Sequence, residues 1–165
     1  MNALIGSLGL DKVDADINAV PEGTYKGVVF KSDIVFVKSK NELTHVVTYK
    51  ITEGTNSGAR LQEWYPLRKN VVFAEGHEGD VDHVTSSESA MDDNAKKWYK
   101  NRLLTLGVQD SEINTTEPAD LLNKEVKFGV KKKNGYTNVS WVDLFKQESQ
   151  ATASEGQTGN VKGLL

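Results

Sequence analysis

The residues around position 134 combine positive charge with an aromatic ring. Three consecutive lysines, Lys131 to Lys133, precede the dipeptide Asn134-Gly135, and Tyr136 follows directly. Asn-Gly between two apolar runs is the strongest short-range signal for a tight hairpin turn. An exposed ring beside three ammonium groups can stack on a planar base and bind phosphate oxygens. The alternative is a soluble turn whose lysines protect a strand edge from pairing.

A second group of such residues follows two strands expected at 43–51 and 59–67, which a Gly-rich loop over 53–58 joins. Strict alternation places polar side chains of both strands on one face. Cations there could bind phosphates, and a tryptophan could stack on a base. Solvated strand charges and a tryptophan that packs at the rim remain the alternatives. The candidates are Lys50, Arg60, Gln62 and Trp64, with Lys26 on the preceding strand as a weaker addition.

The charges are segregated along the chain. Five lysines stand against one glutamate over 124–136, whereas seven carboxylates and no lysine or arginine occupy 70–93. The formal net charge of the 165 residues is only −3, which disfavours a strongly basic duplex-DNA binder. A polar chain with a concentrated basic segment is nevertheless compatible with a nucleic-acid partner.

Catalytic chemistry finds little support, so we expect no enzyme, no cofactor and no metal. Cysteine is absent, which excludes disulfides, thiolate catalysis and cysteine-based metal sites. The loop over 54–58 lacks the lysine and following helix of a phosphate-binding loop. His77 and His83 lie among Asp80 and Asp82, but their spacing matches no standard metal site, and a solvated acidic loop explains them equally well. The carboxylates form no compact cluster typical of a two-metal nuclease.

The order of the expected elements is three strands, a helix and a closing hairpin. The first strand, 24–37, is long, and its alternation slips near 31–33, which predicts a bend. The third strand ends at Pro66, and 71–89 reads as a long acidic loop. A helix over 89–106 and a short one over 116–123 precede the hairpin over 126–142. Five aromatic residues are expected in the core: Tyr25, Tyr49, Trp98, Phe128 and Trp141.

This order fits a mainly β fold, the OB-fold, a five-stranded Greek-key barrel with one helix between strands three and four. An unrelated α+β domain with a helix on an antiparallel sheet is the alternative. We expect an N-terminal arm over 1–20, an OB-fold nucleic-acid-binding domain over 21–146 and a disordered tail over 147–165. No run of apolar residues approaches the ~20 needed to span a bilayer, and no signal peptide is evident.

Six stretches of the chain carry a resemblance to a known family: 20–27, 49–54, 57–60, 103–108, 120–126 and 134–139. They look like the opening strands, the helix and the closing hairpin of bacteriophage-type single-stranded DNA-binding proteins. The resemblance covers roughly 21–142 and implies an OB-fold, with single-stranded DNA as ligand. Many such proteins end in an acidic tail with an apolar tip, whereas the tail here holds only Glu148 and Glu155 and also Lys162. The acidic segment 75–93 is a second departure.

The expected function is to coat and protect single-stranded DNA without sequence preference, in phage DNA replication or recombination. The alternative is a non-catalytic structural or assembly protein built on a small β-barrel. Expected partners are single-stranded DNA and replication or recombination proteins of phage or host, with no membrane, and a homo-oligomer is compatible with the sequence. We expect a cytoplasmic location, in the host cell if the chain is phage-encoded.

Overall fold

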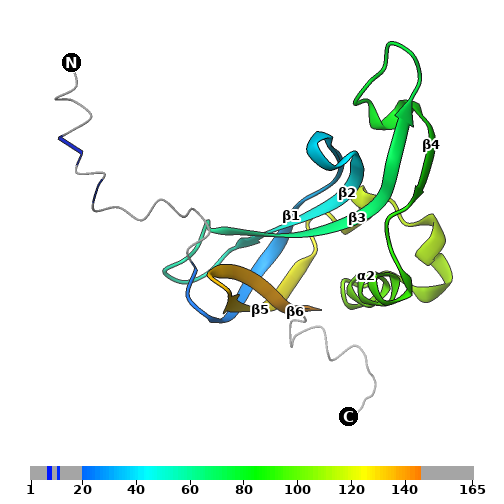
Figure 1. Ribbon diagram of the computed structural model, residues 1–165. Coiled ribbons are helices and arrows are strands. Elements are labelled where there is room, and N and C mark those ends of the chain that lie inside the picture. The colour runs from blue at the N-terminus through cyan, green and yellow to red at the C-terminus, as the bar shows by residue number, and fades with distance from the viewer. Residues whose placement is uncertain (1–6, 9–10, 12–19, 146–165) are drawn as a thin grey trace.

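The computed structural model describes residues 7, 8, 11 and 20–145. A six-stranded antiparallel sheet, in the order β4-β3-β2-β1-β5-β6, curls into a half-barrel (Figure 1). The expected N-terminal arm, apart from residues 7, 8, 11 and 20, and the expected tail lie outside the described residues. The strands are β1 (Gly23–Val37), β2 (Glu42–Ile51), β3 (Arg60–Phe73), β4 (Val84–Ser89), β5 (Glu125–Lys133) and β6 (Tyr136–Leu144).

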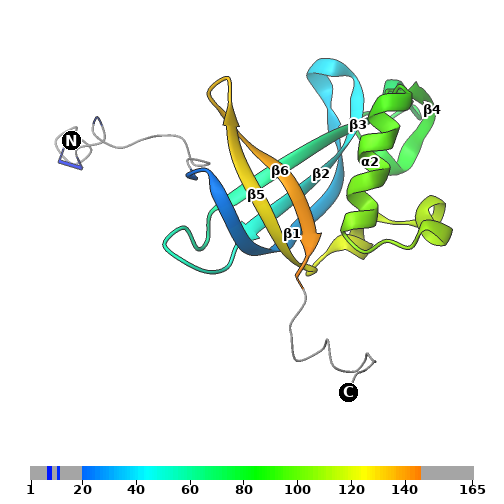
Figure 2. The ribbon, with the colours of Figure 1, turned by 90° about the horizontal axis from the view of Figure 1, so that it is seen from below.

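An α-helix, α2 (Asp93–Thr105), follows β4 and precedes β5 in the sequence. In the fold it contacts β6 (Figure 2). Asp92 caps its first turn by accepting a hydrogen bond of 2.7 Å from the amide of Ala95. The other helical segments between residues 20 and 145 are short 3₁₀ turns. They are η2 (Lys38–Lys40), η3 (Val81–His83), η4 (Asp110–Thr115) and η5 (Pro118–Leu121).

β1 gives the sheet its curl, because it belongs to two ladders. Its first half, from Gly23 to Val28, pairs with β5, and its second half, from Gly27 to Val37, pairs with β2. The register with β2 shifts between Val29 and Lys31, so Phe30 is the extra residue of a bulge. The predicted bend in the first strand is thus confirmed, slightly before its expected position.

The curl brings β6 against β3, although the strand pairs of the described chain include no β3–β6 ladder. The core inside the curve takes residues from five strands, from α2 and from η5. Tyr49 and Phe128 are fully buried in it as predicted, and Tyr25 packs against it. β4 pairs only with the last part of β3, from Arg68 to Phe73. We call the line where β6 approaches the preceding part of β3 the seam.

The third strand is longer than predicted. Pro66 does not end it, because the register with β2 shifts at this point, and Pro66 is tolerated where the ladder is irregular. Segment 71–89 is not a plain loop either, since β3 continues to Phe73 and β4 returns along it. β4 gave no sequence signal because it is a polar, exposed edge strand. Arg68 holds it through hydrogen bonds of 2.8 Å to the hydroxyl and carbonyl of Ser87.

The predicted helices are confirmed in part. α2 begins four residues later than expected, and the short helix expected over 116–123 is a single 3₁₀ turn with Pro118 in its first turn. Trp98 was predicted to face the core, but Tyr99, Leu103 and Leu106 do so instead. None of the helices in the described residues has the length and apolar composition needed to cross a bilayer.

Gly27 lies where the two ladders of β1 overlap, opposite both Ile51 and Val126. A Cβ at this position would overlap the carbonyl oxygen of Lys50 and lie 2.9 Å from the ring of Phe128. Gly27→Ala should therefore lower the free energy of unfolding by about 1–3 kcal/mol, the usual cost of overpacking a core. Urea denaturation measures this loss. A variant as stable as the wild type would contradict the close approach at this crossing.

His45 on β2 is buried, and each ring nitrogen has a hydroxyl partner. Nε2 lies 2.8 Å from Oγ of Ser32, and Nδ1 lies 2.7 Å from the hydroxyl of Tyr99 on α2. Burial lowers the pKa of His45 below its usual value, and the negative charge of Asp33 opposes that effect. The folded state therefore favours the neutral ring, whereas the unfolded chain takes up a proton near pH ~6.5.

Because the unfolded state binds more protons in this range, the stabilisation is complete above pH ~6.5 and declines as the pH falls through that value. The free energy of unfolding should thus fall between pH 7.5 and pH 5.5. His45→Gln, which keeps a donor and an acceptor, should flatten this dependence. Equal pH dependence in the two proteins, followed by urea denaturation, would show that His45 does not supply it.

Candidate nucleic-acid interface

Candidate binding residues from two segments that are far apart in the sequence line one hollow. It has a volume of about 300 Å³ and lies between β3 and the tip of the β5–β6 hairpin. Gln62 and Trp64 come from β3, and Gly135 and Tyr136 come from the hairpin. We call it the hairpin hollow. Curling of the sheet creates it, since these segments are more than 70 residues apart in the sequence.

The two aromatic side chains of the hairpin hollow are largely exposed, Trp64 by 54% and Tyr136 by 74%. A short chain of hydrogen bonds fixes the indole edge. Nε1 of Trp64 donates to Oε1 of Gln62 at 3.2 Å, and Nε2 of Gln62 donates to the hydroxyl of Thr48 at 3.3 Å. Trp64 is thus oriented through its polar edge while about half of its surface stays exposed, an arrangement that suits stacking.

The three lysines of the hairpin lie directly beside this hollow. Lys131, Lys132 and Lys133 are exposed and pair in register with Asn138, Thr137 and Tyr136. Within the described part of the chain, none of the three forms an ion pair. The amide of Lys132 donates to Oε2 of Glu22 at 2.7 Å, which ties the residues before β1 to the hairpin.

Lys50 and Arg60 face each other across the β2–β3 ladder and share one aromatic ring. Nζ of Lys50 lies 5.0 Å from the ring centre of Phe30, and Cζ of Arg60 lies 4.4 Å from it. These are cation–π distances, so the ring of the bulge residue positions both charges. Sequence reasoning missed Phe30, and only the bulge in β1 identifies it.

Lys26 is placed differently from the other candidates. Its ammonium forms an ion pair of 3.1 Å with Glu53 and lies 4.2 Å from the ring centre of Phe145. It does not line the hairpin hollow. The geometry therefore joins Gln62, Trp64 and Tyr136, places the three lysines beside them and Arg60 farther along the same strand face, and leaves Lys26 apart.

A second hollow, of about 470 Å³, lies farther along the seam and was not foreseen. It is lined by Glu63 and Tyr65 of β3, by Trp98 and Arg102 of α2, and by residues 139–143 of β6. We call it the seam hollow. Trp98 is 68% exposed and Trp141 is 37% exposed, so the prediction that both belong to the core was wrong.

The reasons for the two errors differ. The apolar stripe of α2 passes through Tyr99 and Leu103, which turns Trp98 away from the core. Trp141 lies opposite Gly129 in the hairpin register, and a Cβ on Gly129 would overlap its indole. A glycine opposite an aromatic residue leaves room for the ring to cover the strand, a signal that the sequence did contain.

An ion pair at the base of the seam hollow is largely buried. Nη2 of Arg102 lies 2.9 Å from Oε2 of Glu63, and Nε of Arg102 donates to both carboxylate oxygens. The hydroxyl of Tyr49 donates to Oε1 of Glu63 at 2.6 Å. Burial opposes the charge on Arg102, but Glu63 outweighs it, and the pKa of Arg102 is raised. The pair therefore stays ionised and fastens α2 to β3.

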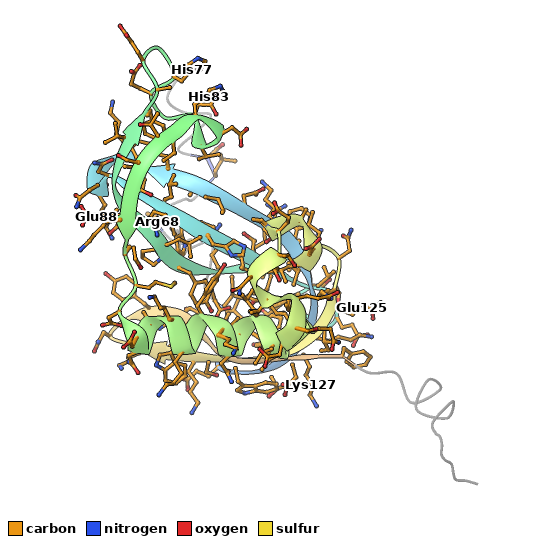
Figure 3. All side chains as sticks on the ribbon, turned by 90° about the vertical axis from the view of Figure 1, so that its right-hand side faces the viewer. Arg68, His77, His83, Glu88, Glu125 and Lys127 are labelled. Carbon is orange, nitrogen blue, oxygen red and sulfur yellow. The ribbon has the colours of Figure 1, made fainter. Side chains whose placement is uncertain are left out.

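His77, Asp80 and His83 form a cluster in which the ligand atoms lie within 4.8 Å of one another. Figure 3 shows the two histidines at the end of the arm that β3 and β4 form. The two imidazoles are stacked, 3.9 Å between ring centres and 8° between planes. The nitrogen lone pairs of the two imidazoles lie in parallel planes, so they do not point to one common metal position. Both oxygens of Asp80 are also engaged, one with the amide of Asp82 and one with His83. As arranged, the cluster is not a chelating site.

Comparison with known proteins identifies no relative of this chain: no protein-family model, no curated protein and no solved structure matches it.

Proposed function

We propose that the protein binds single-stranded DNA without sequence preference, through the hairpin hollow and the lysines beside it. One observation carries the proposal. Two exposed aromatic residues from separate strands, Trp64 and Tyr136, flank one hollow beside three lysines without ion pairs among the described residues. Stacking rings next to cations are the features that non-specific binding of single strands requires.

The arrangement of strands supports the same proposal. β1 pairs with both β2 and β5, the helix precedes β5, and β6 returns toward β3. We propose that this sheet is an OB-fold extended by the additional strand β4. In that fold the second and third strands and the neighbouring loops bind oligonucleotides. The candidate residues of β2, β3 and the hairpin lie in corresponding places.

Coating of single strands in phage replication or recombination is the role we propose, in keeping with the resemblance of the sequence. A structural protein of the same architecture would assemble without nucleic acid. Binding of a fluorescently labelled thymidine oligonucleotide, followed by anisotropy at low and moderate salt, separates the two. A duplex of equal length is the control, and no binding of the single strand at low salt would reject the proposal.

Removing charge from the hairpin should change how binding depends on salt. Lys131→Ala combined with Lys132→Ala should weaken binding at low salt. The slope of log K against log salt concentration should become shallower by ~0.7 for each phosphate that the variant no longer neutralises. Lys124→Ala with Lys127→Ala removes the same charge from the start of β5, at the end of the hairpin opposite its turn, and is the matched control. An equal effect of both pairs would mean that net charge, not the hairpin, governs binding.

Removing the indole of β3 should weaken binding without this change in slope. Trp64→Ala should raise the Kd at least ~5-fold, since a stacked base contributes about 1–3 kcal/mol. Trp64→Phe keeps a stacking face and should restore most of the affinity. Anisotropy titrations at several salt concentrations measure both quantities. Wild-type affinity of Trp64→Ala would remove Trp64 from the site.

A further inference from the structure

The seam hollow exposes two tryptophans that the proposed function does not use. Trp98 projects from α2 and Trp141 from β6, and both line the same hollow. An indole exposed by 68% on a helix surface is a large apolar area left in water, which marks a binding surface when it adjoins a second one. Trp141 is also held in place, because its ring covers Gly129.

The two hollows follow each other along β6 and open on opposite faces of β3. On β3, Gln62 and Trp64 line the hairpin hollow, while Glu63 and Tyr65, whose side chains alternate with them, line the seam hollow. On β6, residues 136–138 line the first and residues 139–143 the second. A ligand that passes Trp64 and Tyr136 and continues along β6 therefore reaches Trp141 and Trp98 next.

α2 contributes two exposed lysines beside the seam hollow, Lys96 and Lys97, which form no ion pair among the described residues and could bind phosphate oxygens. The other two cations of α2 are already paired, Lys100 with Asp110 and Arg102 with Glu63. Asp143 also lines the hollow and forms no ion pair among the described residues. The lining thus presents aromatic faces and hydrogen-bonding groups, with one carboxylate that is not in an ion pair.

We propose that Trp98 and Trp141 form a second base-stacking site, which continues the path of single-stranded DNA from the hairpin hollow along the β3–β6 seam onto α2. The inference rests on the proposed function and extends it. Four aromatic side chains, Trp64, Tyr136, Trp141 and Trp98, would then contact successive parts of one strand. A short oligonucleotide fills the hairpin hollow alone, and a longer one also reaches the second site.

The three tryptophans of the chain allow a direct test, since each can be kept as the only indole. Three variants retain Trp64, Trp98 or Trp141, with phenylalanine at the other two positions. Each is titrated with thymidine oligonucleotides of about 4 and about 16 nucleotides, the limits of the site sizes known for one such fold. The 4-mer should quench Trp64 alone. The 16-mer should quench all three.

Affinity provides the second readout. Trp98→Ala with Trp141→Ala should weaken binding of the 16-mer about tenfold or more, and binding of the 4-mer less than twofold. Trp98→Phe with Trp141→Phe should restore the 16-mer affinity. Trp98→Ala alone is included because Trp98 is the more exposed of the two, so its removal should leave folding intact. Urea denaturation of each variant checks stability.

The outcomes separate this inference from the proposed function. If the 16-mer quenches Trp64 but neither Trp98 nor Trp141, and the double alanine variant binds it like the wild type, the inference is wrong while the function stands. The seam hollow would then be open to a protein partner instead. If neither oligonucleotide changes any signal or binds at low salt, both proposals fail.

Discussion

The fold depends on β1, because this one strand pairs with both β2 and β5. At Gly27 this strand exchanges its β5 partner for β2, and the backbones there approach so closely that a single methyl group would overlap a carbonyl oxygen. The bulge at Phe30 completes the bend. Because the sheet turns through this point, the β5–β6 hairpin is carried over toward β3. Without that turn, Trp64 and Tyr136 would lie on opposite parts of a flat sheet.

Two polar connections hold α2 against the inner face of the curled sheet. Arg102 binds Glu63 of β3, and Tyr99 contacts His45 of β2. Removing one partner of the buried ion pair would leave the other charge unpaired, which is strongly destabilising. These contacts fix the helix beside β6 and thereby place Trp98 next to Trp141. Of the four residues in these two connections, Glu63 and Arg102 also line the seam hollow.

Local patterns predicted most strands and the hairpin, because Val126, Phe128 and Val130 alternate cleanly and Asn134-Gly135 fixes the turn. They failed for β4, whose polar residues carry no periodicity and whose pairing depends on Arg68. They also failed for Trp98 and Trp141, since hydrophobicity alone does not tell an indole in the core from one exposed beside it. The juxtaposition of Trp64 with Tyr136 depends on how the whole sheet curls, which no local pattern encodes.

We propose above all that single-stranded DNA binds in the hairpin hollow, between Trp64 and Tyr136. The decisive experiment is photocrosslinking with a thymidine oligonucleotide that carries 4-thiothymidine, followed by mass spectrometry of the linked peptides. We expect crosslinks in the β3 peptide with Trp64 and in the hairpin peptide with Tyr136, both competed by unlabelled single strands and not by duplex. Crosslinks concentrated elsewhere, for example around Lys26 and Glu53 or on the β3–β4 arm, would contradict it.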